Sequence, residues 1–296
     1  AVGFPARDFA VETIAIEDLD RIEPAVLIDR MIRARQALAA GRPGFAHEFA
    51  YLMVDGSTLR EDALMAVVGH GLGPVPLFGG SAGDGLSFKQ TWLLANGQVV
   101  TNAAIFLLVE TDLSVSEVTF AHFSPTATRV VVTAAIPEKR RILELNAEPA
   151  AEEYARLTGL RRADLTPSEF ARHPLLLRMG GRHHVRAISA ITDDDGLSLM
   201  SSIDTGTVLT LGRSEDLIQG FSDLLEALPT PPLMVLAFDC ILRRLALERA
   251  GLTDRMSDLY RRHRVAGFNT YGEQHSGMHV NQTFVGLAFM RSDDVA

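Results

Sequence analysis

The chain contains one cysteine, Cys240, among its 296 residues, which excludes an internal disulfide framework. Such cysteine usage is typical of proteins from a reducing compartment. No apolar run approaches the ~18 residues that a membrane-spanning helix requires, and the first residues do not follow the pattern of a secretory signal peptide. We therefore expect a cytoplasmic protein that does not enter a membrane.

An excess of positive charge is absent as well. The formal net charge is −9, whereas nucleic-acid-binding domains usually present a basic face. Two basic clusters, at residues 139–141 and 261–264, are short, and we interpret them as solvated faces or partner contacts. We expect no nucleic-acid partner.

Apolar residues are abundant, at 47% of the chain, which is enough for a large buried core. At ~150 residues per domain, the length fits two domains or one large one. A predicted helix over 149–158, with Pro149 in its first turn and Gly159 as its stop, forms the connector. Because no low-complexity linker is present, we expect two tightly packed subdomains, residues 1–158 and 159–296.

The first half of the chain changes its pattern part-way. Apolar spacing predicts a helix over 24–39, a buried strand over 49–54, and a helix over 59–70 with Ser57 as its N-cap. From residue 76 to 145 almost every segment reads as a strand, and Asn96-Gly97 is a hairpin signal. The sequence therefore predicts a mixed α/β (α+β) fold with mixed sheets.

The second half predicts strands and helices in succession. The expected strands cover residues 183–191, 196–203, 206–212 and 233–240, and the expected helices cover residues 214–228, 241–250 and 253–263. The cluster Asp193-Asp194-Asp195-Gly196 could suggest calcium, but it lacks the later ligand positions of an EF-hand. Asp-Gly between alternating strands favours a hairpin turn.

A glycine-rich segment covers residues 79–85. A phosphate-binding loop would end in Lys-Ser or Lys-Thr and lead into a helix, and neither follows here. We expect a tight loop whose glycines let the backbone approach another element or a ligand.

Cys240 ends a buried strand just before a helix that has Arg243 and Arg244 in its first turn. A helix N-terminus and neighbouring guanidinium groups both favour the thiolate, which would make the cysteine reactive or ligand-binding. The alternative is a small packed residue at the floor of a pocket, because free cysteine is among the most buried residue types.

The polar segment near the end of the chain carries two histidines, His275 and His279. On a helix this spacing would form a metal-binding pair, but the glycines around it argue against a helix. In a strand the two residues lie ~13 Å apart, too far for one ion. We expect a loop over 271–277, then a strand with His279, Asn281 and Thr283 on one face, which faces solvent or lines a cavity.

Several of these motifs resemble the FIST sensory domain family, and the resemblance covers essentially the whole chain. In the first half it rests on Gly79-Gly80-Ser81-Ala82-Gly83-Asp84, Phe120-Ala121-His122 and residues 142–154. In the second half it rests on His173-Pro174-Leu175, residues 183–191, Phe238-Asp239-Cys240 with Arg243, and the closing motif Gly267-Phe268, Thr270, Gly272-Glu273, His279, Asn281 and Thr283.

Family members usually begin with a further strand–helix–strand unit. This chain begins with residues 1–16, which already alternate like a strand. The resemblance thus implies that the N-terminal part of the first subdomain is missing.

The resemblance implies a non-enzymatic intracellular sensor that regulates a separate signalling protein, either a histidine kinase of a two-component system or a cyclic-di-GMP enzyme, and it allows for a homodimer. The implied small-molecule pocket lies between the two halves. Its expected ligand-binding residues are Gly79, Gly80, Ser81, Asp84, Cys240, Arg243, Asn269, Glu273, His279, Asn281 and Thr283.

The ligand itself is open. One branch of the family, the NosP proteins, binds haem and senses nitric oxide, which would make His279 the first choice for the iron ligand and His122 the second. The alternative is a haem-independent sensor of a small metabolite such as an amino acid. From other classes, an enzyme could use Cys240 as nucleophile or His279 with Glu273 as acid and base, and a scaffold would bind only a protein.

Overall fold

The computed structural model of the chain describes residues 3–41, 44–85, 87, 89–275 and 277–291. Its helices are α1 (Pro24–Gly41), α2 (Glu61–Leu72), α3 (Ala150–Thr158), α4 (Pro167–Arg172), α5 (Gln219–Glu226), α6 (Ile241–Ala250) and α7 (Thr253–Arg262). Its strands are β1 (Phe9–Glu17), β2 (His47–Asp55), β3 (Leu77–Ala82), β4 (Leu93–Ala95), β5 (Gln98–Val100), β6 (Ala103–Thr111), β7 (Ser114–Phe120), β8 (Phe123–Ile136), β9 (Arg141–Leu145), β10 (Glu148–Pro149), β11 (Leu175–Met179), β12 (Arg182–Arg186), β13 (Ile188–Ile191), β14 (Leu197–Leu199), β15 (Val208–Ser214), β16 (Met234–Cys240), β17 (Val265–Thr270), β18 (Glu273–His275), β19 (Met278–Val280) and β20 (Phe284–Met290). The predicted mixed α/β fold is confirmed.

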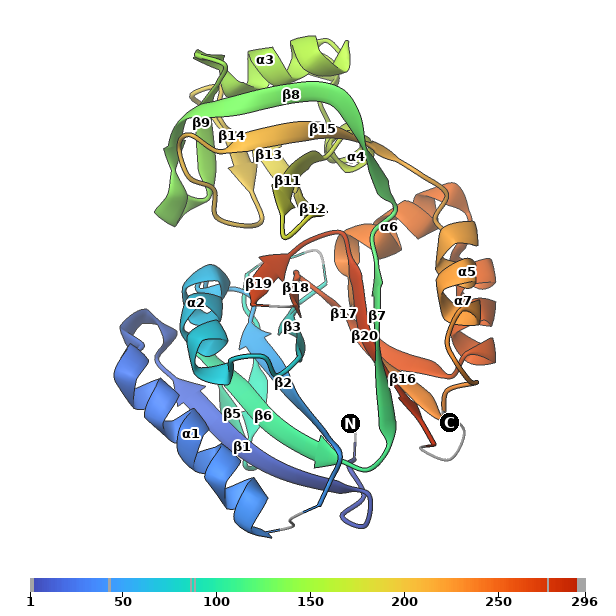
Figure 1. Cartoon of the computed structure of the whole chain (residues 1–296). Coiled ribbons are helices and arrows are strands. Elements are labelled where there is room, and N and C mark those ends of the chain that lie inside the picture. The colour runs from blue at the N-terminus through green and yellow to red at the C-terminus, as the bar shows by residue number, and fades with distance from the viewer. Residues whose placement is uncertain (1–2, 42–43, 86, 88, 276, 292–296) are drawn as a thin grey trace.

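Two sheets form the inner layers of a helix–sheet–sheet–helix arrangement (Figure 1). The first sheet has the strand order β1-β6-β2-β3-β18-β19, and the third sheet has the order β17-β16-β20-β7. Helices α1 and α2 cover the outer face of the first sheet, while α5, α6 and α7 lie on the outer side of the third.

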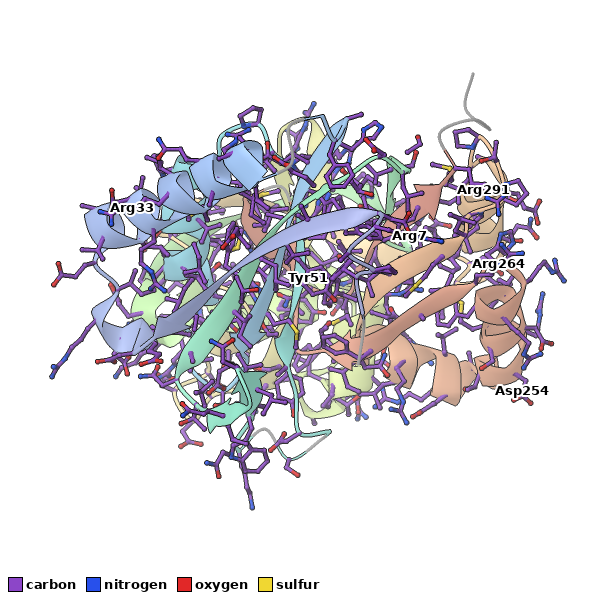
Figure 2. All side chains as sticks on the ribbon, turned by 90° about the horizontal axis from the view of Figure 1, so that it is seen from below. Arg7, Arg33, Tyr51, Asp254, Arg264 and Arg291 are labelled. Carbon is purple, nitrogen blue, oxygen red and sulfur yellow. The ribbon has the colours of Figure 1, made fainter. Side chains whose placement is uncertain are left out.

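Strand β2 explains why the two sheets pack face to face. Its side chains alternate, so that Leu52 joins the core under α1 and α2, whereas Phe49 and Tyr51 face the third sheet. The ring centroids of Tyr51 and Phe238 lie 4.8 Å apart across this interface. Seen from below, Tyr51 lies in the middle of the molecule, while Arg33 and Asp254 lie at its periphery (Figure 2).

A second lobe sits above these layers (Figure 1). Its sheet, the second sheet, has the order β12-β11-β15-β8-β9-β14-β13, with β10 paired to β9. Helices α3 and α4 cover one face of it and contribute Tyr154 and Phe170 to its core. The long strand β8 continues directly from β7 and connects the lobe to the layers below.

The two halves of the sequence share all three large sheets. Strands β18 and β19 complete the first sheet, β8 and β9 belong to the second, and β7 forms the edge of the third. The division into residues 1–158 and 159–296 therefore stays a prediction. Each of the three large sheets contains strands from both parts.

Several local predictions are confirmed. Asn96 and Gly97 have φ values of 50° and 80° and join the hairpin β4–β5. The Asp-rich cluster is the turn between β13 and β14, with Asp195 at φ 59°. Helix α3 ends at Gly159, which has φ 72°. Among the described helices, none combines the length and the apolar character needed to cross a membrane.

Two helix starts differ from prediction. Ser57 is not the N-cap of α2, which begins at Glu61; the Ser57 hydroxyl instead donates to Asp55 Oδ1 at 2.6 Å. Helix α5 begins at Gln219 rather than at Ser214, because Ser214 is still paired in β15. In both places an aspartate side chain stabilises a non-helical turn, and the helix begins only after this turn.

Two predicted loops are strands. Residues 79–82 belong to β3, paired in parallel with β2 and antiparallel with β18. Glycine at position 79 permits this pairing, because a Cβ there would collide with the carbonyl oxygen of Leu52. Within the predicted loop 271–277, residues 273–275 form β18, which turns back into β19 as a hairpin. The glycines of residues 79–85 were predicted to let the backbone approach another element. For those in β3, that element is the neighbouring strands β2 and β18.

Candidate functional site

A cavity of about 550 Å³, here called the central cavity, lies where the second lobe meets α6 and the loop before α2. A volume of this size is typical of small-molecule sites. Its lining residues are Gly56, Ser57, Leu59, Glu61, Lys139, Arg140, Pro167, Ala171, Ile188, Ser189, Ser198, Leu199, Met200, Leu242, Leu245, Tyr271 and Gln282.

The wall of the central cavity combines apolar and polar residues. Ile188 and Leu199 come from the second lobe, and Leu242 comes from α6. Glu61, Arg140, Tyr271 and Gln282 supply buried polar side chains; their exposed fractions are 1%, 5%, 6% and 3%. This combination suits an amphipathic ligand.

A buried ion-pair group joins the second lobe to α2 beside the central cavity. Arg140 Nη2 donates to Glu61 Oε2 at 2.6 Å and to Asp62 Oδ2 at 3.1 Å, and its Nη1 donates to the carbonyl of Met200 at 2.7 Å. The backbone N–H of Ser202 also donates to Asp62 Oδ2, at 3.0 Å. Both carboxylates lie in the first turn of α2, where the helix dipole favours negative charge.

Gln282 combines three unusual properties. Its backbone has φ 53°, a left-handed conformation that a non-glycine residue rarely adopts. Its side chain is 3% exposed and lines the central cavity. Its Oε1 atom has no hydrogen-bond partner among the described residues. Strained backbone and an orphaned buried acceptor are both costly, and such features concentrate at binding sites.

Further buried polar atoms without a hydrogen-bond partner belong to residues near Gln282 in the sequence or on the segment paired with Asn281. Asn281 pairs by an isolated β-bridge with Val185, the residue before Arg186. The buried atoms without a partner among the described residues here are Arg186 Nε, Gln274 Oε1, His279 Nε2 and Asn281 Nδ2. Native interiors leave few such atoms, so this region is poorly satisfied without a ligand or water.

A hydrogen-bond chain runs from Glu61 to His279 behind the cavity wall. Ser81 Oγ donates to Glu61 Oε1 at 3.2 Å, and Gln274 Nε2 donates to Ser81 Oγ at 2.9 Å. The same amide nitrogen lies 3.3 Å from His279 Nδ1. Burial lowers the pKa of His279, so the ring is neutral.

His279 does not line the central cavity. Its Nε2 lies against Gly272: a Cβ at that glycine would sit 2.7 Å from Nε2 and 2.8 Å from Asn281 Nδ2. A haem held by His279 would need open space where Gly272 now packs.

His122 is enclosed by a second buried network. Arg243 Nε donates to Asp239 Oδ1 at 2.7 Å, and its guanidinium carbon lies 5.2 Å from the ring centroid of Phe120. Arg243 Nη1 reaches His122 Nδ1 at 3.5 Å. Burial, followed by the positive charge of Arg243, holds the pKa of His122 well below its ordinary value. Tyr260 completes the network by donating to Asp239 Oδ2 at 2.7 Å.

The residues present therefore do not fit a haem in the central cavity. Neither His279 nor His122 lines it. Among the described residues, no three or more His, Cys, Asp and Glu side chains are grouped so as to hold a metal ion.

Cys240 is 1% exposed, and its environment opposes ionisation. Burial, and next the carboxyl of Glu273, raise the pKa of the thiol well above its ordinary value. Burial also raises the pKa of Glu273 well above its usual range, although Thr270 Oγ1 donates to it at 2.5 Å. A buried neutral thiol does not favour the alternative of a thiol-dependent enzyme.

None of the eleven residues predicted to bind a ligand lines the central cavity, and their roles stay predictions. The structure places several of them directly behind its wall. Ser81 holds Glu61, Asp84 holds Tyr271 through its hydroxyl, and Asn281 accepts from Ser201. Asn269 instead donates to the carbonyl of Asp239, at 3.2 Å.

Sequence reasoning missed Glu61, Arg140, Tyr271 and Gln282. Glu61 and Arg140 are 79 positions apart, and no local pattern links them. Strand alternation alone would place Gln282 on the opposite face from Asn281, and its positive φ interrupts this alternation. A signal existed for Tyr271 and Gln282, because each adjoins a residue of the closing motif.

Comparison with known proteins gives a consistent result along the chain. Residues 1–148 match the sequence model of the FIST N domain, and residues 150–276 match that of the FIST C domain. No curated protein matches, and no solved structure matches.

Proposed function

We propose that this chain, which belongs to the FIST family of sensory domains, is a sensor that binds a small organic ligand in the central cavity and regulates a separate signalling protein. The FIST domains are sensor domains of signalling proteins, and the central cavity supplies a site of suitable size. The partner we propose is a histidine kinase or a cyclic-di-GMP enzyme.

One observation carries the proposal: the strained, buried Gln282 lines the central cavity, and its Oε1 has no hydrogen-bond partner among the described residues. An unsatisfied buried acceptor costs ~1–3 kcal/mol, and backbone strain adds a similar amount. A ligand that donates a hydrogen bond to Oε1 would recover part of this cost.

The ligand class that fits best is an amino acid with an apolar side chain. Its hydrocarbon part would contact Ile188, Leu199 and Leu242. Its ammonium group would donate to Gln282 Oε1, and its carboxylate would lie toward Arg140. This metabolite is favoured over haem, because no histidine lines the central cavity.

Arg140 offers a route from ligand to output. It lines the central cavity and also joins the second lobe to Glu61 and Asp62 of α2. A ligand carboxylate near Arg140 would compete with these two carboxylates for its guanidinium group. The resulting change in the contact between the lobe and α2 would be the signal that a partner detects.

Calorimetry with leucine and with 4-methylpentanoate, which lacks the ammonium group, tests the ligand assignment. We expect the wild type to bind leucine ~10–100-fold more tightly than 4-methylpentanoate. This ratio corresponds to the free energy of a hydrogen bond from a charged donor. In Gln282→Leu this preference should vanish, whereas in Gln98→Leu, a change on the exposed strand β5, it should remain. No binding across the standard amino acids would contradict the amino-acid class.

Haem is tested separately by the visible spectrum after reconstitution. We expect the Soret band of added haem to stay as it is in protein-free buffer. A shifted band that is lost in His279→Ala or in His122→Ala would overturn our preference and restore the haem sensor.

A further inference from the structure

A second hollow, of about 370 Å³, lies on the second sheet and is lined by basic residues. We call it the basic hollow. Its lining residues are Pro125, Thr126, Arg129, Arg178, His183, Val208 and Thr210. They come from β8, β11, β12 and β15, so the tertiary fold rather than a local run of sequence brings the basic groups together.

Strand register places the three basic side chains on one face. Arg178 on β11 is directly opposite His183 on β12. On the other side of β11, Leu176 pairs with Thr210 of β15, which in turn pairs with Arg129 of β8. Side chains two apart on a strand share a face, so Arg178 and Arg129 lie on the same side of the sheet.

The opposite face carries the core of the second lobe, including Val130 and Leu209. The basic side chains are therefore turned away from that core, toward the hollow.

The basic groups lack compensating partners. The side chains of Arg129, Arg178 and His183 make no hydrogen bond or ion pair with another described residue, although their backbones pair within the sheet. No acidic side chain is among the described residues that line the hollow. Two arginines without an acidic neighbour in the hollow are an unusual placement in a chain of net charge −9.

The hydrogen-bond donors around the basic hollow indicate the class of ligand that it would bind. Two guanidinium forks, an imidazole and the hydroxyls of Thr126 and Thr210 surround the hollow. Thr126 Oγ1 already accepts from the backbone N–H of Thr128 at 3.2 Å, so its own proton is available for donation. A phosphate monoester offers about two negative charges and three strong acceptor oxygens, and arginine forks match its geometry.

We propose that the basic hollow binds a small phosphate monoester. Arg129 and Arg178 each donate to its phosphate oxygens from opposite sides, with Thr210 between them on β15. The volume accommodates the phosphate group with a compact substituent. This site is separate from the central cavity, since the two share no lining residue.

Calorimetry of the full chain with inorganic phosphate and with glycerol 3-phosphate, at constant ionic strength, tests the site. We expect one equivalent of either probe to bind, and glycerol or acetate not to bind. Arg129→Gln and Arg178→Gln should each weaken binding by about ten-fold or more, as expected for loss of a charge-assisted contact. Both side chains are exposed, so the variants should keep the fold, which circular dichroism checks.

Arg262→Gln is the matched control. Arg262 is an exposed arginine at the end of α7, outside the hollow, and its loss changes the net charge equally. We expect it to alter affinity less than two-fold. If all three variants weakened phosphate binding equally, phosphate would be attracted only by the overall charge of the protein, and the proposed site would be wrong. It would also be wrong if the wild type did not bind phosphate. Gln282→Leu should leave phosphate binding intact, which keeps this test independent of the central cavity.

Discussion

At residue 282 the backbone turns into the left-handed region, and this glutamine lines the central cavity. Strand alternation from Asn281 to Thr283 would have placed it elsewhere. Non-glycine residues with positive φ leave no periodic trace in a sequence. For this reason strand alternation could predict a polar row of His279, Asn281 and Thr283, but it could not predict that Gln282 lines the cavity.

Gly272 allows a test at the same scale. Its φ is 142°, and a Cβ would meet the ring of His279 and the amide of Asn281. We expect Gly272→Ala to lower the free energy of unfolding by about 2 kcal/mol or more, through strain plus collision. Gly85→Ala is the control, because φ is 81° there and no atom lies within 4 Å of the Cβ position. If urea unfolding gave equal losses for both, the collision would contribute nothing.

Cys240 should be unreactive in the folded protein. Burial raises its pKa, so the thiolate is scarce at neutral pH, and 1% exposure blocks access. We expect iodoacetamide to label it at pH 8 only after unfolding in urea, as measured by mass spectrometry. Rapid labelling of the folded chain would revive the thiol-dependent enzyme.

His122 should make stability depend on pH. Because its pKa is lowered in the folded state, the unfolded state binds the proton first, near pH 6.5. The free energy of unfolding therefore falls as pH drops below ~6.5, by about 1.4 kcal/mol per pH unit from this group. His122→Gln should reduce that slope between about pH 5 and 6, and above about pH 7.5 the two curves should be parallel. Identical slopes in urea titrations would show that the ring is already charged in the fold.

Among the elements, helices and strands with regular apolar spacing were predictable, since periodicity reports which face is buried. Helix α3 is an example, with a sequence-readable start and stop. The start of α2 was not readable, because the turn at Ser57 is stabilised by Asp55 and continues through Leu59 at φ 56°. Strand β18 was hidden because its partner β3 is about 190 positions earlier in the chain.

The contact between α2 and the second lobe can be measured by a double-mutant cycle. Arg140→Met leaves Glu61 buried without its cation, and we expect a loss of ~3–5 kcal/mol in the free energy of unfolding. Arg140→Met combined with Glu61→Leu should cost clearly less than the sum of the two single changes, since the buried charge of Glu61 is removed together with its cation and only the more exposed Asp62 loses a partner. Additive costs in urea unfolding would mean that the pair is not coupled.

At the scale of the whole molecule, the family and the fold class followed from motifs spread along the chain. The way in which the two halves share their sheets did not follow from the sequence, because strand partners that are up to nearly 200 positions apart carry no common signal. The same limit applies to the central cavity and to the basic hollow, whose walls combine distant segments.

Separating the chain at residue 158 tests this sharing. We expect residues 1–158 and 159–296, produced alone, to lack cooperative unfolding, because each would expose strands that pair across the division. Refolding both together should restore a complex with the circular dichroism and elution volume of the intact protein. A fragment that unfolds cooperatively by itself would show that its sheets close without the other.

Strand β7 lies at the edge of the third sheet and pairs with β20 alone. During synthesis, residues 114–120 leave the ribosome long before residues 284–290 exist. At ~5–20 residues per second, this interval is roughly 10–30 s. Throughout that time β7 has no partner strand in the nascent chain. The yield of the newly made protein in a cell should therefore respond to translation speed as well as to the stability of the finished fold.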